Sequence, residues 1–219
     1  MNLELRALGL GLLAAVAISA GLAASAGANG EGHFVTDLAH TDIEGFVSGD
    51  HKLHFSLHGM EDEVGCNTHY YTATPTTATT TSITVTPHYE ECVTTSNGIA
   101  TPIEANGCTY TFTVAKGTTD KTEQTAHLLC PAGQKIEILH LNCTIDIHPQ
   151  TISSGITYTR KEVKGVHYIT LDAAVQVTTT RHGPCQFILP TNGVSTLSGF
   201  IVVRAFKPKT LAIVNVTAT

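Results

Sequence analysis

Polar and apolar residues alternate along most of the chain with a period of two. The pattern is clearest between residues 107 and 147, where every second residue is apolar or a cysteine in three runs: Cys108 to Val114, Ile136 to Ile138, and Cys143 to Ile147. Successive side chains of a strand point to opposite faces, so this period is typical of strands that bury one face. Outside an N-terminal leader, no run longer than a turn has the 3.6-residue apolar period of a helix. The pattern predicts an all-β fold.

The same alternation continues on both sides of this stretch. Further predicted strands are 51–58, 135–139, 155–160, 166–177, 185–189 and 194–206. In total, about eleven strands at short spacing predict an antiparallel β-sandwich or a partly open barrel, stapled by disulfides.

Two pairs of cysteines each enclose a predicted hairpin. Between Cys66 and Cys92 the arms are 69–74 and 82–89, and the segment from Cys108 to Cys130 repeats the plan at smaller size. Pro87 has no amide hydrogen to donate to a ladder, so we expect a sheet edge at that point.

The N-terminus is typical of a secretory signal peptide. A polar head, Met1 to Arg6, precedes an apolar run, Ala7 to Ala24, which ends in small residues that a signal peptidase could cut. The run is shorter than the ~20 residues of a spanning helix, so we expect cleavage and no stable membrane insertion afterwards. The predicted organisation is a signal peptide at 1–28, a loosely ordered arm at 29–45, a single all-β domain at 46–206 and a C-terminal tail at 207–219.

Charge narrows the range of partners. The formal net charge is −6, and lysines and arginines are scattered along the chain. Neither a basic face for nucleic acid nor a polybasic cluster for an anionic membrane is present, so no nucleic-acid partner is expected. We expect a secreted or cell-envelope monomer whose partners the sequence does not identify.

All six cysteines lie in the part that would be exported: Cys66, Cys92, Cys108, Cys130, Cys143 and Cys185. An even number of cysteines in an exported domain predicts three disulfides. Hairpin geometry favours Cys66–Cys92 and Cys108–Cys130, which leaves Cys143–Cys185. The alternative joins Cys130 to Cys143 and Cys108 to Cys185, and the sequence leaves the connectivity open beyond a preference for Cys66–Cys92.

Histidine is the most suggestive candidate for chemistry. His51, His54 and His58 would share one face of a helix and could hold a metal there, whereas on a strand only His54 and His58 share a face, and it is the solvated one. No Cys-x-x-Cys pair, His-Glu-x-x-His motif, nucleophile elbow or phosphate-binding loop occurs. We therefore assign no catalytic, cofactor-binding or metal-binding residue and expect no cofactor.

Four cysteine-centred motifs resemble a family of small secreted proteins from high-GC Gram-positive soil bacteria. They are Thr84-Val-Thr-Pro87 followed by Tyr89 and Cys92, Asn106-Gly-Cys-Thr-Tyr-Thr-Phe112, Cys130-Pro-Ala-Gly-Gln-Lys-Ile136, and Cys143-Thr-Ile145 with Pro149-Gln-Thr151. The resemblance covers roughly residues 41–206 and implies a bacterial origin, export, a β fold and paired cysteines. It implies no activity, cofactor or catalytic residue.

Three hypotheses for function follow from the sequence. The first is an exported β-domain that acts as an extracellular or cell-envelope binding or structural module. The second is an extracellular hydrolase with non-standard catalytic residues, in which His167 or His182 acts with a nearby Asp or Glu. The third is a histidine-dependent metal binder.

Overall fold

The computed structural model of the chain describes residues 32–40, 42–47, 53–56, 63–75, 77–114, 121–184, 192–206, 213–214 and 216–218. These residues form strands and the turns between them, with no α-helix. The strands are β1 (Phe34–Thr36), β2 (Asp42–Val47), β3 (Leu53–Ser56), β4 (Glu63–Ala73), β5 (Thr79–Thr80), β6 (Ser82–Thr94), β7 (Ile103–Glu104), β8 (Thr109–Val114), β9 (Lys121–Leu129), β10 (Ile136–His140), β11 (Cys143–Ile147), β12 (Gln150–Ile152), β13 (Ile156–Val163), β14 (Val166–His182), β15 (Asn192–Phe206), β16 (Ile213–Val214) and β17 (Val216–Ala218).

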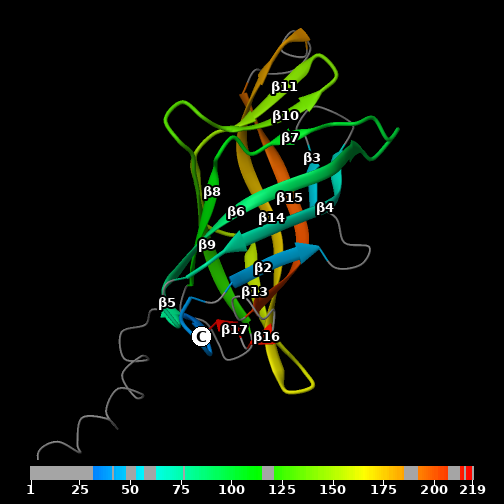
Figure 1. Ribbon diagram of the computed structural model, residues 1–219. Helices are drawn as coiled ribbons and strands as arrows, with labels where there is room; N and C mark the ends of the chain where they lie inside the picture. Colours follow the sequence, from blue (N-terminus) through cyan, green and yellow to red (C-terminus); the bar gives the residue numbers. More distant parts are fainter. Residues whose placement is uncertain are drawn as a thin grey trace, which may run out of the picture. The chain divides into compact units, whose positions relative to one another are not determined.

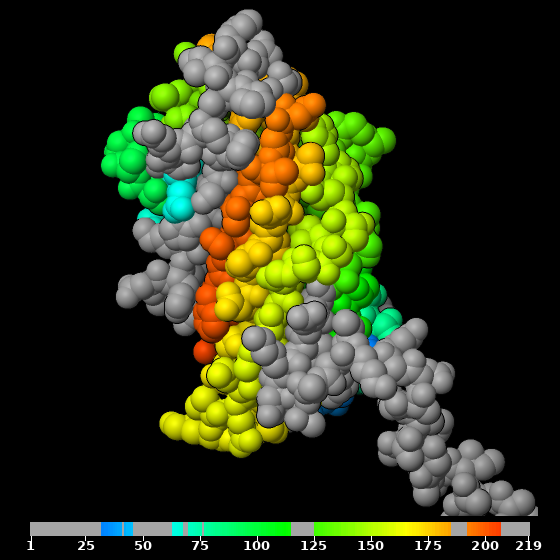
Figure 2. Space-filling view, turned by 180° about the vertical axis from the view of Figure 1, so that it is seen from behind, coloured from blue at the N-terminus to red at the C-terminus, as the bar shows by residue number. Residues whose placement is uncertain are grey.

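One large antiparallel sheet contains fourteen of these strands and curls around an apolar interior (Figure 1). Its order is β16-β15-β2-β4-β6-β8-β9-β13-β14-β11-β10-β7, with β3 and β12 paired beside this path. A further ladder joins β14 directly to β15, from Ile169–Val203 to Thr180–Asn192. Figure 2 shows these two long strands side by side from behind. Because of this ladder, eight strands follow one another in a ring: β2, β4, β6, β8, β9, β13, β14 and β15.

This architecture confirms the predicted all-β antiparallel fold, in the form of one sheet that curls on itself. The sequence alternation explains which face of the curled sheet is turned inward. On β14, Leu171, Val175 and Val177 are buried while Asp172 and Gln176 between them are exposed. Each strand of the ring turns one such apolar row inward, and burying these rows against one another is the main favourable term in folding.

The cysteines confirm two of the predicted disulfides. Cys66–Cys92 joins directly paired residues of β4 and β6, and Cys108–Cys130 joins the open ends of β8 and β9. The alternative with Cys130–Cys143 and Cys108–Cys185 is therefore wrong. Cys143 is also disulfide-bonded, so none of the five described cysteines is free. The predicted partner, Cys185, lies outside the described residues.

The structure corrects the predicted domain boundaries at both ends. β1 and the first four residues of β2 lie in the segment 29–45 that was predicted to be a loose arm, and β16 and β17 lie in the predicted tail. A second, three-stranded sheet in the order β17-β1-β5 joins the first and the last of the described strands. β1, β16 and β17 have only two or three residues each, so the alternation does not identify them. The predicted signal peptide, 1–28, lies outside the described residues.

Two local predictions also have an outcome. The ladder between β6 and β8 ends at Val85, two residues before Pro87. Pro87, which has no amide hydrogen to donate, therefore has no partner on β8, as expected for a sheet edge. Of the predicted strand 51–58, the structure describes Leu53–Ser56 as β3, paired with both β4 and β15. The described part of the chain contains no helix with the length and hydropathy that a membrane crossing requires.

We predict that Cys66→Ala/Cys92→Ala lowers the free energy of unfolding by about 3–4 kcal/mol, because the disulfide closes a loop of 26 residues in the unfolded chain. Urea unfolding, with the slope compared between variants, measures the loss. Thr84→Ala/Thr111→Ala is the matched control, since these exposed threonines face each other on β6 and β8 and share a 2.8 Å hydroxyl contact. We expect the control to lose less than about 1 kcal/mol. A loss as small as the control's in the cysteine variant would contradict the prediction.

Candidate functional site

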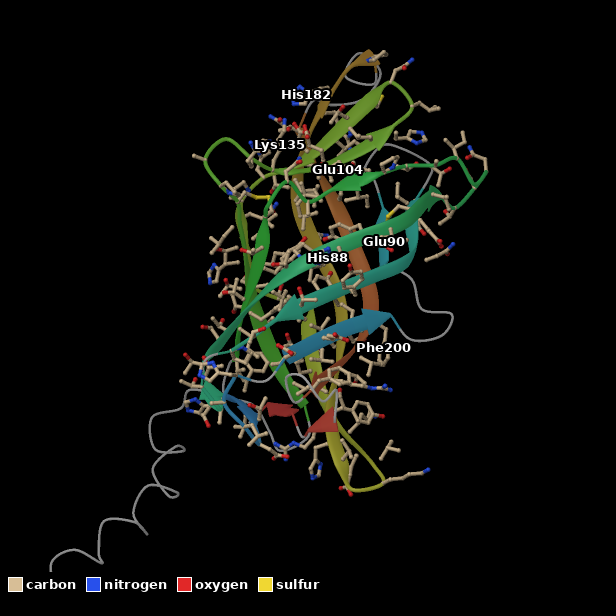
Figure 3. All side chains as sticks on the ribbon, in the orientation of Figure 1. His88, Glu90, Glu104, Lys135, His182 and Phe200 are labelled. Atoms are coloured by element: carbon tan, nitrogen blue, oxygen red, sulfur yellow. A yellow bond between two sulfur atoms is a disulfide. The ribbon has the colours of Figure 1, made fainter. Side chains whose placement is uncertain are left out.

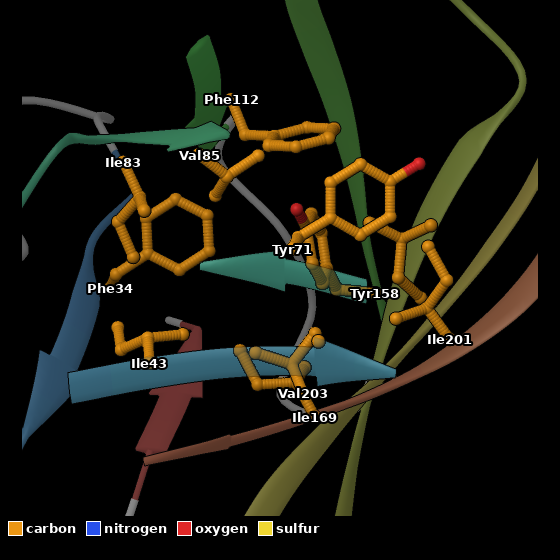
Figure 4. Close-up of a pocket in the computed structure, with 12 residues that line it drawn as sticks. Phe34, Ile43, Tyr71, Ile83, Val85, Phe112, Tyr158, Ile169, Ile201 and Val203 are labelled. Carbon is orange, nitrogen blue, oxygen red and sulfur yellow. The ribbon is translucent and has the colours of Figure 1, made fainter. Parts of the chain in front are cut away.

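Two adjoining hollows lie inside the curled sheet. The first has a volume of about 40 Å³ and the second about 30 Å³, and their walls share Tyr71, Phe112, Leu171 and Ile201. Figure 4 shows the aromatic rings and branched aliphatic side chains around the first hollow. Such a space is large enough for a few water-sized groups, but it lies far below the ~300 Å³ of an ordinary ligand pocket.

Aromatic rings account for much of this wall. Phe34 meets Tyr158 edge to face with ring centroids 5.5 Å apart, and Phe112 meets the same tyrosine at 6.3 Å. Tyr71 and Tyr110 meet at 6.2 Å with their planes 75° apart. Edge-to-face contacts contribute about 0.5–1.5 kcal/mol each beyond the area they bury. The rings therefore fix the shape of the interior.

Tyrosine hydroxyls supply the polar atoms of this otherwise apolar interior. The hydroxyls of Tyr89 and Tyr110 are 3.3 Å apart, and Tyr71 hydrogen-bonds to Tyr89. Burial raises the pKa of Tyr110 to about 12, and burial also raises the pKa of Tyr71, Tyr89 and Tyr158. All four phenols are consequently neutral at physiological pH, and each can donate or accept a hydrogen bond.

A second polar group lies where β10, β11 and β14 meet. The Asp146 side chain on β11 is fully buried, and its Oδ2 accepts hydrogen bonds from Lys135 Nζ at 2.6 Å and from His182 Nε2 at 2.7 Å. The Asp146 bond raises the pKa of Lys135, which also lies 3.5 Å from Glu137. Figure 3 shows Lys135 and His182 at the same end of the molecule, beside β10 and β11. We call Lys135, Asp146, His182 and Glu137 the outer cluster.

The register explains how the outer cluster forms. Glu137 is paired with Asp146 across β10 and β11, and His182 on β14 is paired with Thr144, two residues before Asp146. Side chains at paired positions and at every second residue share a face. The chain segments that carry Lys135, Asp146 and His182 are thus brought together only by the ladders of the curled sheet.

The opposite face of the same strands buries a cation. Arg181 belongs to the inward row of β14 that includes Val177 and Thr179, and it has no exposed surface. Its guanidinium packs over Gly193 of β15, where an added Cβ would lie 3.2 Å from two of its nitrogens. Burial lowers the pKa of Arg181. A residue larger than glycine at 193 would therefore press on this buried side chain.

The structure places both histidines of the hydrolase hypothesis near an acid. His182 lies 2.7 Å from Asp146, whereas His167 Nδ1 lies 3.9 Å from the Glu162 carboxylate on an exposed hairpin. A histidine held by a buried carboxylate has the arrangement of an oriented general base. The geometry therefore distinguishes the two, because His182 is the one that lies within hydrogen-bonding distance of its carboxylate.

The metal hypothesis receives no support from the described residues. Among them, no group of three or more His, Cys, Asp or Glu side chains could hold a metal ion. His51 and His58 lie outside the described residues, and for His54 the structure describes the strand but not the side chain. The hypothesis stays a prediction for that segment.

Sequence reasoning missed both the interior tyrosines and the outer cluster. The period of two does place Tyr110 and Tyr158 on inward rows, but nothing local says that four tyrosines from β4, β6, β8 and β13 converge. For Asp146 the sequence shows a single acidic residue between Ile145 and Ile147. The structure adds that all three of these residues are buried.

Comparisons with known proteins identify no relative. No protein-family model, no curated protein and no solved structure matches this chain. The resemblance to a family of secreted bacterial proteins therefore stays a prediction.

We predict alkaline unfolding driven by the buried tyrosines. An unfolded tyrosine ionises near pH 10, whereas burial raises the pKa of Tyr110 to about 12, so the folded state holds more protons between these values. Stability should be complete below pH 10 and fall above it by about 1.4 kcal/mol per pH unit for each such tyrosine. Circular dichroism and phenolate absorbance should change together, and Tyr110→Phe should reduce the slope. Phenolate absorbance that rises fully while the fold persists would contradict this.

We predict that Lys135→Met destabilises the protein more than Asp146→Asn at neutral pH. The first leaves a buried carboxylate without its cation, at a cost of about 3–5 kcal/mol, whereas the second leaves Lys135 and His182 partly exposed and able to turn to water. Urea unfolding of the two variants and of the double variant measures the coupling. The double variant should cost less than the sum. Strict additivity would show that the contact contributes nothing.

Proposed function

We propose that the protein is an exported binding module that holds a small, predominantly apolar molecule inside its curled sheet. The observation that carries the proposal is the pair of adjoining hollows walled by apolar rows and supplied with tyrosine hydroxyls. Ligand sites are typically apolar with a few placed polar groups, and they occur inside curled sheets of about eight strands. The interior has both properties.

The chemistry of the wall defines the class of ligand. Neutral phenols and hydrocarbon side chains offer no counter-ion in the hollows, so a charged guest would lose its hydration without compensation. An aromatic or aliphatic guest with one hydroxyl or carbonyl would match the edge-to-face rings and find a hydrogen bond at the tyrosines. The guest is small because the hollows are small.

An extracellular or cell-envelope location is part of the proposal. Two disulfides between described cysteines, with none of these cysteines free, are consistent with an oxidising compartment. The leader at 1–28 supplies the route of export. The acidic net charge of −6 argues against a nucleic-acid partner.

Titration with benzene, followed by amide chemical shifts, tests the binding proposal. We expect shifts on the inward-facing residues of the ring and saturation. Val85→Phe, which fills space in the first hollow, should weaken binding about tenfold or more. Thr86→Phe is the matched control, because Thr86 is the next residue on β6 and is exposed. Equal binding by both variants, or shifts confined to the outer face, would refute an interior site.

A second candidate function rests on the 2.7 Å contact between His182 and Asp146. In this reading the pair activates water or a hydroxyl group in an extracellular hydrolase. A panel of ester, peptide and glycoside substrates tests it with His182→Gln and, as the matched control, His167→Gln. We expect any turnover to fall by about a hundredfold or more in the first variant only, since general-base catalysis contributes on that order. Turnover that survives His182→Gln would eliminate this candidate.

A further inference from the structure

Phe34 has an exceptional position in the wall of the first hollow. Eleven of the twelve lining residues come from strands of the ring, namely β2, β4, β6, β8, β13, β14 and β15. Phe34 alone comes from outside the ring, from the three-residue strand β1. Its side chain is 3% exposed and meets Tyr158 edge to face. Figure 4 shows its ring inside the group of lining side chains.

The attachment of β1 is slight in comparison with that of the ring strands. β1 pairs with β17 through three residues and with β5 through two, and none of its pairings belongs to the large sheet. The Thr36 amide donates to Ala78 O at 2.8 Å, in the connection that leads into β5. By contrast, the β14–β15 ladder extends over twelve residue pairs. Short elements with few backbone bonds open at lower free energy than the long ladders of a core.

We propose that Phe34 is a built-in plug and that the ligand enters by replacing its ring. The inference rests on the proposed function and specifies both the ligand and the regulation of that site. The open hollows of about 40 and 30 Å³ are too small for a benzene ring, which occupies a cavity near 150 Å³ in a protein interior. Withdrawal of the Phe34 side chain from the wall of the first hollow adds the volume of one such ring to that hollow. The matching ligand class is a single six-membered ring, aromatic or saturated, with at most one hydroxyl or carbonyl.

The plug also gives the binding reaction a switch. With Phe34 seated, the apolar rows are covered and β1 stays in the small sheet with the C-terminal strand β17. With a ligand seated, Phe34 must leave Tyr158, and the backbone bonds of β1 then lose their anchor. Ligand occupancy is thereby coupled to release of the N-terminal strand, because the two rings compete for one volume.

Benzene binding to the full chain and to Phe34→Ala tests the plug. We expect the variant to bind benzene about ten- to a hundredfold more tightly, because the ligand no longer replaces a buried phenylalanine. Val35→Ala is the matched control on the same strand and should leave the affinity unchanged. In the unsubstituted chain, saturating benzene should accelerate hydrogen exchange at the Thr36 amide while the amides of β14 keep their protection.

The outcomes separate the plug from the proposed function. Equal affinity of the chain and Phe34→Ala, with unchanged exchange at Thr36, would overturn the plug and leave interior binding standing. Absence of benzene binding in both proteins would overturn interior binding and the plug together. Should Phe34→Ala fail to fold, the exchange of the Thr36 amide in the unsubstituted chain decides: acceleration by benzene supports the plug, and unchanged or slower exchange refutes it.

Discussion

The ladder between β14 and β15 is the interaction on which the interior depends. Its twelve residue pairs connect strands that the order of the sheet would otherwise leave far apart, and so the sheet returns on itself. Without this ladder, the inward rows of β2 to β14 would form one face of an open, strongly twisted sheet exposed to water. Closure converts those rows into a shared core and removes two unpaired edges.

The interior shows how such a ring is filled. Eight strands enclose a space that side chains can fill, and here they nearly do so, with large rings from strands two apart in the ring meeting edge to face. Tyr71, Tyr89 and Tyr110 retain hydroxyls in this space because they hydrogen-bond to one another, which offsets their loss of water. Phe34, which does not come from a strand of the ring, completes the wall of the first hollow. A core of this kind is both the source of stability and an enclosed volume for a guest.

The outer cluster lies at the end of the same sheet that β10, β11 and β14 form. β7, β10 and β11 extend beyond the ring. The first part of β14 pairs with β13, and its last part pairs with β11 instead. Asp146 is fully buried there, and Lys135 and His182 hold it from two sides. A buried carboxylate with two donors requires its partners to stay in place, so the extension is tied to the ring by charge as well as by backbone bonds. Arg181, on the other face of β14, places a second charge out of water on the strand next to that of Asp146.

The sequence by itself determined the class of fold and most of the strands, and it favoured the two disulfides that close the hairpins. These depend on local information: the period of two fixes which residues face inward, and cysteines at the open ends of a hairpin lie within reach of each other. It could not determine β1 and β17, whose three residues each carry no readable period, nor the meeting of Lys135, Asp146 and His182. Only the tertiary structure decided that Phe34 lies inside the ring and that four tyrosines converge. The reason is that these contacts are set by the pairing of strands far apart in the chain, and an alternating pattern tells a residue which face it occupies but not which strand lies beside it.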